Sequence, residues 1–371
     1  TYESTINLLH CSNWMLSVCE SARNATINTI NNPGGQDLCV QATLNNSTYR
    51  NNSPTFSEYP TPFICAGNYY CYNNGAIEID GDSLSYSLVT PLNTATGGTI
   101  NYITPYSVTN PVGGGSSFDQ TTGNLCVTPT NSITGVLAIE VSEYRNGILI
   151  GSITRDIQIN AFLCTSINPP ALTGINTPTI VDINDINSYS YELNCTDGSQ
   201  NIIFNINTLN NNNPTITGSA VNMSWNNGIP GASFTVSNNN TINPTGTFIW
   251  TPTIADIIGS PYFFTVNVIN EACPAPGSFT FQYQIILNGP DINITPNITN
   301  PSCNGLNNGA INTIVTGGNI PYIYNWTNGQ STPNIYNLSA GTYSLTVTDS
   351  LGLSLIHISE PTRPRLISYA V

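Results

Sequence analysis

The chain has 371 residues and a formal net charge of −14; only 7% of its residues are charged, and its six cationic side chains are all Arg. An average soluble domain is about 25% charged. A chain so poor in cations cannot neutralise a run of phosphates, so its composition argues against nucleic acid as a partner. Because the chain contains no Lys, Schiff-base and P-loop chemistry are excluded. With only two His, it has few side chains suited to general acid–base catalysis.

The residue types predict an all-β protein. Thr, Ile, Val and Tyr favour strands, whereas Asn, together with 30 Gly and 25 Pro, serves turns. The helix formers Glu, Gln and Met are scarce. No apolar run reaches the roughly 18 residues that a membrane helix needs, so no membrane span is expected in this sequence.

The ten Cys residues lack the spacing of a zinc site. They predict disulfides, and therefore an oxidising compartment and a secreted, extracellular or cell-surface location. Buried free thiols are the alternative. The chain begins at Thr1 without Met or signal peptide, so we expect its true start to be missing or removed.

Residues 1–56 predict a partial N-terminal β region, with alternating apolar residues from Leu38 to Leu44 and three Cys. His10 stands directly beside Cys11; immediate neighbours cannot form a useful catalytic dyad, so a structural His is expected. The Pro-rich stretch 53–62 predicts a stiff joint before the next module.

Two longer modules follow, and they share a repeated sequence pattern. Residues 122–130 and 245–253 share the pattern TG-x4-TPT. Each copy is followed by a β-patterned run and a strand that begins with Gly-Ser. In the second copy Phe279, Phe281 and Tyr283 alternate onto one face. Units of roughly 100–125 residues made of short strands predict tandem β-sandwiches in a beads-on-a-string array.

The register of this repeat predicts disulfides. Cys126 falls where the second copy has Ile249, and Cys71 also lacks a counterpart. A bridge is lost as a pair, so we expect Cys71 to pair with Cys126. Cys65 aligns with Cys195, whose nearby partner is Cys273, and this gives a second expected pair, Cys195–Cys273. The register leaves open the pairing of Cys11, Cys19, Cys39, Cys65, Cys164 and Cys303.

Two motifs are candidates for binding. Glu78, Asp80 and Asp82 alternate around a Gly, and carboxylates placed in this way are candidate ligands of Ca²⁺; the alternative is a hairpin turn with solvated acids. No other cofactor is expected. Aromatic residues could stack on sugars if they lie at loop tips, or belong to the core; these are Tyr69, Tyr70, Tyr72, Trp225 and Trp250.

Residues 57–164 resemble a cadherin-like or immunoglobulin-like module of large secreted proteins from Bacteroidota. The matching text lies at 62–65, 71–75, 80–88 and 143–147. Residues 165–290 look like a diverged copy of the same module.

Residues 291–352 resemble the SprB-type repeat of gliding-motility adhesins. The resemblance is carried by 303–305, 308–311, Gly317-Gly318, Pro321-Tyr322, Tyr324, Trp326, Asn328-Gly329, Asn337-Leu338, 340–343 and 347–349. Tyr322, Tyr324 and Trp326 alternate onto one face, as do Tyr343, Leu345 and Val347, so two strands can bury an aromatic core. The resemblance implies a surface adhesin exported by the type IX system.

The composition changes at residues 353–371, where Asn and Thr almost vanish. This stretch resembles the translation of a sequencing-library adapter, so we expect it to be an artefact that truncates the repeat. The family pattern places a Cys where Leu353 stands. Cys303 is therefore expected to have lost its partner.

These observations predict a non-catalytic structural or adhesive fragment of a large secreted or surface protein, associated with gliding motility. Its expected partner is a surface polysaccharide or another cell-surface ligand. The alternative is a carbohydrate-binding accessory region of a secreted polysaccharide-degrading enzyme.

Overall fold

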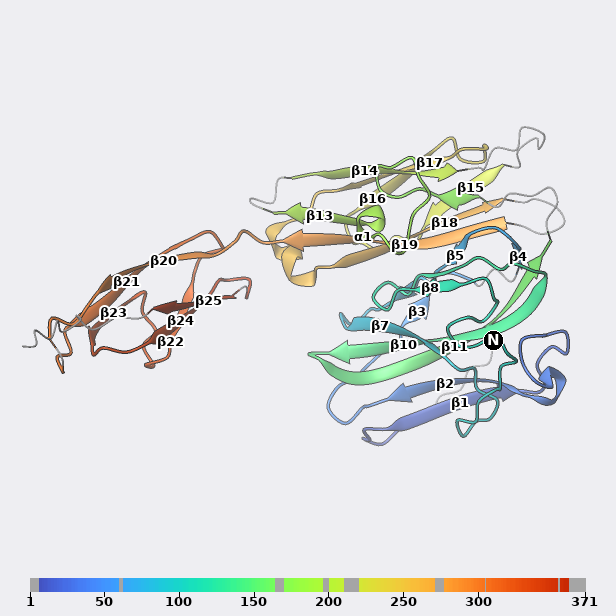
Figure 1. The fold of residues 1–371 in the computed structure, drawn as a ribbon, viewed down its shortest axis with the longest axis horizontal. Helices are drawn as coiled ribbons and strands as arrows, with labels where there is room; N and C mark the ends of the chain where they lie inside the picture. The colour runs from blue at the N-terminus through green and yellow to red at the C-terminus, as the bar shows by residue number, and fades with distance from the viewer. Residues whose placement is uncertain are drawn as a thin grey trace, which may run out of the picture. The chain divides into compact units, whose positions relative to one another are not determined.

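The computed structural model describes residues 7–59, 63–163, 170–195, 200–209, 220–270, 277–303, 305–352 and 354–359 (Figure 1). The chain divides into two compact units: unit 1 comprises Thr1–Tyr191, Ile202–Trp250 and Tyr262–Ile285, and unit 2 comprises Glu192–Asn201, Thr251–Pro261 and Ile286–Val371. Strands dominate both units. Among the described residues, no helix is both long and apolar enough to span a bilayer.

The largest sheet of unit 1 begins at the N-terminus. Its order is β1 (Trp14–Glu20), β2 (Leu38–Leu44), β11 (Ile148–Phe162), β10 (Ile133–Arg145) and β7 (Ser83–Val89), with β4 (Phe63–Cys65) also paired to β11. The expected boundary between residues 56 and 57 therefore does not separate two sheets, because Leu44 of β2 pairs with Gly151 of β11. The long strand β11 has backbone groups to satisfy along this edge, and β2 satisfies them.

Shorter strands complete the first sandwich. One sheet holds β5 (Tyr70–Tyr72), β9 (Leu125–Val127) and β8 (Ser116–Phe118), and another pairs β3 (Thr55–Phe56) with β6 (Ala76–Ile77). Their inward side chains join those of β10 and β11 in one core, which includes Tyr70, Tyr72, Leu125, Leu137 and Ile139.

The second sandwich is made of two four-stranded sheets. One has the order β12 (Ala171–Leu172), β14 (Ile202–Leu209), β17 (Thr245–Trp250), β16 (Ser233–Ser237), and the other β13 (Ser190–Asn194), β19 (Gly277–Asn288), β18 (Tyr262–Asn270), β15 (Val221–Trp225). The single turn of helix α1 (Ile186–Tyr189) precedes β13. Phe248 lies between Phe204 and Phe264, with ring centroids 4.9 and 4.8 Å away.

Strand β19 is buried on both faces within unit 1. Its alternating Phe279, Phe281 and Tyr283 face the aromatic core, as the sequence predicts, yet the polar residues between them, such as Gln282, are also buried. The amide of Asn124 in the first sandwich donates to the Gln282 carbonyl over 2.9 Å and accepts from its N–H over 2.8 Å. The second face of β19 is thus covered by the first sandwich, and its polar groups are satisfied there.

Unit 2 contains the SprB-like region. One sheet has the order β20 (Asn293–Thr299), β21 (Gly309–Thr316), β23 (Asn334–Leu338), and the other β22 (Ile323–Trp326), β24 (Tyr343–Thr348), β25 (Ser354–Ser359). Trp326, Leu345 and Val347 lie in its core, and Tyr322 and Tyr324 pack against that core. Strand β25 belongs to the stretch 353–371; its β-favouring run Leu355-Ile356 pairs with the edge that β24 offers.

Candidate functional site

The acidic loop lies between β6 and β7 in unit 1. The carboxylates of Glu78, Asp80 and Asp82 converge, with one oxygen from each within 4.8 Å of the others. Glu78 closes the loop, because its two oxygens accept the N–H groups of Asp80 and Asp82 over 2.8 and 2.7 Å. Gly81 has a φ of 82°, a conformation that an L side chain rarely adopts.

Two of these acids bind partners from distant segments. Arg145 of β10 donates from Nε and Nη2 to the two oxygens of Asp82 over 2.6 and 2.7 Å, and lies 3.7 Å from Asp80. Hydrogen bonding to Asp82 raises the pKa of the Arg145 guanidinium. Asn52 donates its backbone N–H and its amide to Asp80 over 2.6 and 2.9 Å, which lowers the pKa of that carboxyl.

A fourth carboxylate, Glu143, belongs to the same electrostatic neighbourhood. Its side chain is only 1% exposed, and it lies at a β-bulge of β10 between Glu143 and Tyr144. Asn51 donates to its Oε2 over 2.9 Å, whereas Oε1 has no hydrogen-bond partner among the described residues. Burial, opposed by the Asn51 hydrogen bond and reinforced by the three acids of the loop, raises the pKa of Glu143 to about 7.

The structure brings together all three predicted metal-ligating residues and adds Arg145, which occupies both oxygens of Asp82. Carboxylate oxygens are the ligands that Ca²⁺ prefers. Each of the three acids already has a partner, so an ion would have to displace the Arg145 guanidinium from Asp82. The arrangement as it stands is an ion-paired loop closure.

Sequence reasoning did not identify Asn52, Arg145 or Glu143 as parts of this cluster. Asn52 lies 28 residues from Asp80, and Arg145 lies 63 residues from Asp82. In a chain so rich in Asn, no local signal distinguishes Asn52. The scarcity of Arg was the one usable signal, because each cation of an acidic chain is expected to have an acidic partner.

The disulfides stabilise unit 1. Cys71 and Cys126, the pair expected from the repeat register, are bonded and lie opposite each other on β5 and β9. Cys19 and Cys39, whose pairing the sequence left open, are bonded across β1 and β2. Cys65 is also disulfide-bonded. Cys11 and Cys303 carry free thiols.

The expected pair Cys195–Cys273 is wrong. Cys195 carries a buried free thiol whose pKa is raised by burial, and Cys273 lies outside the described residues. The N–H of Cys195 donates over 2.8 Å to the carbonyl of Asn288, the last residue of β19. The repeat register aligned Cys65 with Cys195, but the alignment of one Cys does not establish which Cys bonds to it.

The aromatic residues considered for sugar stacking lie in cores. Tyr70, Tyr72 and Trp250 are at most 4% exposed. Trp225 stacks on Phe234 at 5.7 Å between centroids, and Tyr69 packs against Phe279. None of the five is an open platform. His10 is exposed, and its Nδ1 contacts the carbonyl oxygen of Asn46 over 2.9 Å.

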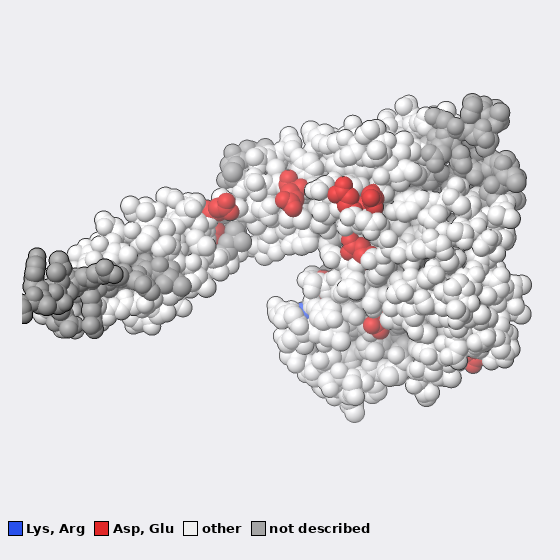
Figure 2. Space-filling view, in the orientation of Figure 1, with Lys and Arg blue, Asp and Glu red and all other residues white. Residues whose placement is uncertain are grey.

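Charge is sparse on the surface as well as in the sequence. Figure 2 shows, on the face it draws, acidic side chains in a few separate groups and almost no cationic ones. Three of the described Arg residues hold acids or carbonyls: Arg23 pairs with the buried carboxylate of Asp156 over 2.6 Å, Arg145 binds Asp82, and Arg155 donates to the Glu58 carbonyl. These three cations therefore stabilise the fold, whereas Arg50 is exposed.

The SprB repeat family model matches residues 295–331, and no curated protein matches the sequence. Among solved structures, the chain is similar to Sidekick-1 immunoglobulin domains 1–5, with 10% identity, coverage of 94% of this chain and 74% of that one, and a TM-score of 0.21. It is similar to the protocadherin gamma B2 extracellular cadherin domains 1–5, with 11% identity, 93% and 72% coverage and a TM-score of 0.25.

A third similar structure is the ectodomain of mouse nectin-like molecule 4, with 11% identity, 83% and 99% coverage and a TM-score of 0.22. At such scores the whole-chain superpositions support no functional argument. The chain is an all-β protein of packed β-sandwiches, in which residues 295–331 match the SprB repeat family.

Proposed function

We propose that this chain is a non-catalytic, adhesive or structural part of a large secreted or cell-surface protein associated with gliding motility. The observation that carries the proposal is the SprB repeat match at residues 295–331 in a chain that otherwise consists of disulfide-bonded β-sandwiches. Asn124 of the first sandwich exchanges two hydrogen bonds with the backbone of Gln282 in the second, so the two sandwiches of unit 1 are in contact. Sandwiches that contact one another suit a protein that projects a binding surface from a cell.

Adhesion by beads tests this proposal. Beads coated with the full chain are expected to adhere to polysaccharide-coated glass under flow, whereas beads coated with an unrelated acidic protein of similar charge detach. Equal detachment of both kinds of bead would contradict an adhesive function. Deletion of the gene in its host, followed by measurement of spreading on agar, tests the association with gliding.

We also propose that the acidic loop binds Ca²⁺, because three carboxylates lie within 4.8 Å of one another. Binding requires Arg145 to leave Asp82, so Arg145→Gln is expected to raise Ca²⁺ affinity. Isothermal titration of the wild type, Arg145→Gln and Asp80→Asn with Ca²⁺, with Mg²⁺ as control, tests it. Absence of heat in both wild type and Arg145→Gln would contradict the proposal.

A further inference from the structure

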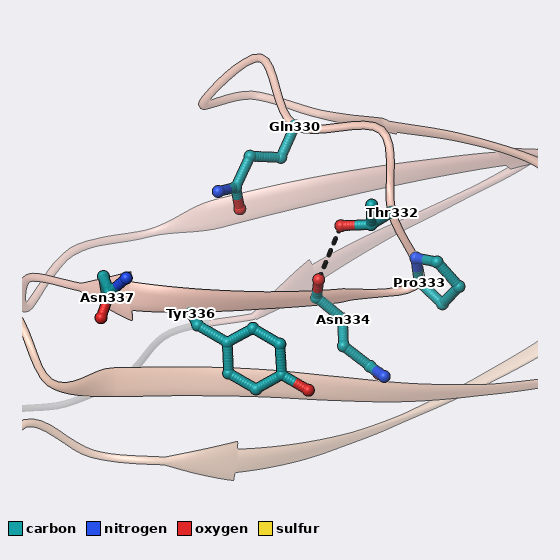
Figure 3. Close-up of a pocket in the computed structure, with 6 residues that line it drawn as sticks. All are labelled: Gln330, Thr332, Pro333, Asn334, Tyr336 and Asn337. Atoms are coloured by element: carbon teal, nitrogen blue, oxygen red, sulfur yellow. Dashed lines mark hydrogen bonds between the residues drawn. The ribbon is translucent and has the colours of Figure 1, made fainter.

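A hollow of about 400 Å³ opens on the SprB-like repeat, within the range of roughly 300–1,000 Å³ that small-molecule sites occupy. Figure 3 shows its six lining residues, which come from strand β23 and the loop before it: Gln330, Thr332, Pro333, Asn334, Tyr336 and Asn337. All lining side chains are uncharged, and five of the six are polar or aromatic. The hollow is therefore a neutral polar site.

The loop wall of the hollow is fixed by the buried Trp326. Its backbone N–H donates to the Gln330 carbonyl over 3.0 Å, and its indole Nε1 donates to the Thr332 carbonyl over 2.9 Å. The Thr332 hydroxyl then donates to the Asn334 carbonyl over 2.7 Å, as the dashed line in Figure 3 marks. The backbone of the loop thus has little freedom left to lose when a ligand binds.

A β-bulge aims the other wall outward. Tyr336 pairs with Ala310, and Leu338 pairs with Gly309, so Asn337 is an extra residue without a partner in the ladder. Asn337 has a φ of 58°. Successive residues of a regular strand point to opposite faces, but this bulge leaves both Tyr336 and Asn337 exposed, with 54% of Tyr336 accessible.

The polar groups of the lining keep hydrogen-bonding capacity. Asn334 uses its Oδ1 to accept the N–H of Thr313 over 3.0 Å, and its Nδ2 makes no hydrogen bond within the described residues. The Tyr336 hydroxyl and the Asn337 amide likewise make none there. The described part of unit 2 contains neither Arg nor Lys, so it offers no cation for a carboxylate, sulfate or phosphate group of a ligand.

We propose that this hollow binds a neutral carbohydrate. The apolar face of a sugar ring stacks on Tyr336, and its hydroxyl groups, which donate and accept, pair with the amides of Asn334 and Asn337. The side-chain amide of Gln330 closes the opposite side of the hollow. This inference rests on the proposed adhesive function and names its ligand class and its site.

Titration of the full chain with oligosaccharides tests the inference, with ligand-observed NMR as the readout. The probes are neutral gluco-, manno- and galacto-oligosaccharides and, as a charged set, oligogalacturonate. We expect saturable binding of a neutral probe. Tyr336→Ala is expected to weaken it at least about tenfold, because the stacking surface is lost, and Tyr336→Phe is expected to keep it within about threefold. Tyr59→Ala removes a Tyr that is 89% exposed in unit 1, and is the matched control for non-specific stacking.

Three results would overturn the inference: binding of no neutral probe, binding of the charged probe alone, or equal affinity of wild type and Tyr336→Ala. Thermal melting confirms that Tyr336→Ala stays folded. Bead adhesion separates the two proposals. If Tyr336→Ala beads adhere as strongly as wild-type beads, this site is refuted while the adhesive function stands; if wild-type beads do not adhere, the function itself fails.

Discussion

The two sandwiches of unit 1 use the same strand pair and stabilise it in different ways. Cys71 of β5 lies opposite Cys126 of β9 and is bonded to it. In the second copy, Ile203 of β14 lies opposite Ile249 of β17, and both are exposed, at 55% and 38%. The same pair of positions thus holds a buried disulfide in the first copy and two exposed Ile side chains in the second.

The aromatic core offsets the missing bond. Next to the bridge, the first copy pairs Tyr72 with Leu125; at the same register position the second copy pairs Phe204 with Phe248, whose rings stack with an interplanar angle of 9°. The stack extends through Phe264 to Tyr283, 5.5 Å further on. The comparison shows that one sandwich pattern tolerates either a covalent or a packing solution at its centre.

The aromatic stack is the larger of the two effects. Phe248→Ala removes a side chain that is 0% exposed and leaves a cavity. It is therefore expected to lower the free energy of unfolding of unit 1 by about 3–5 kcal/mol. Urea unfolding followed by circular dichroism measures the loss. Ile249→Ala, the next residue of β17, is the control, with an expected loss below about 1 kcal/mol. Equal losses would show that the stack does not stabilise the second copy.

Removal of the bridge tests the first copy. Cys71→Ala/Cys126→Ala removes a bond between positions 55 residues apart in the sequence, and is expected to lower the free energy of unfolding by about 2–4 kcal/mol. Thermal melting under oxidising conditions measures this. Cys303→Ser, at an exposed free thiol, is expected to leave the melting temperature unchanged. A double variant as stable as wild type would contradict the role assigned to the bridge.

Transfer of the bridge to the second copy tests whether the two strand pairs are equivalent. Ile203→Cys/Ile249→Cys places two Cys at the register positions that Cys71 and Cys126 hold in the first copy. The oxidised variant is expected to gain about 1–3 kcal/mol over its reduced form. Melting with and without reductant gives the difference. A variant that does not oxidise would show that the two strand pairs are not equivalent.

A smaller effect concerns Glu143, which has no counterpart identified in the second copy. Its folded pKa is about 7, raised from 4.5. Between these values the folded state holds a proton that the unfolded chain has released, so stability falls as pH rises from about 4.5 to 7. Glu143→Gln imitates the protonated form and is expected to be more stable than wild type by about 1–3 kcal/mol at pH 8 and equal to it near pH 4.5.

Parallel melts of wild type and Glu143→Gln across that pH range measure this difference. Glu140→Gln on the same strand is the control. A constant difference at all pH values would indicate that the amide changes packing, and would reject the charge-based explanation.

Elements with local signals can be predicted from the amino-acid sequence alone. Alternation in β19 and β24 predicts strands because the side-chain period of a strand is two residues, and the TG-x4-TPT repeat identifies two related modules. Paired loss of Cys71 and Cys126 pointed to a contact between residues far apart in sequence. The repeat did not indicate a partner for Cys195, because the Cys expected to pair with it has no counterpart in the first copy.

Contacts between groups far apart in the sequence depend on how the strands pack. The attachment of β2 to β11, the pairing of Arg145 with Asp82 and the burial of Glu143 all depend on segments separated by tens of residues. The bulge that exposes Tyr336 is set by the pairing of β23 with β21. The abundance of Asn does not indicate which Asn makes a given contact. Many identical side chains could make it, and the packing of the strands selects one of them.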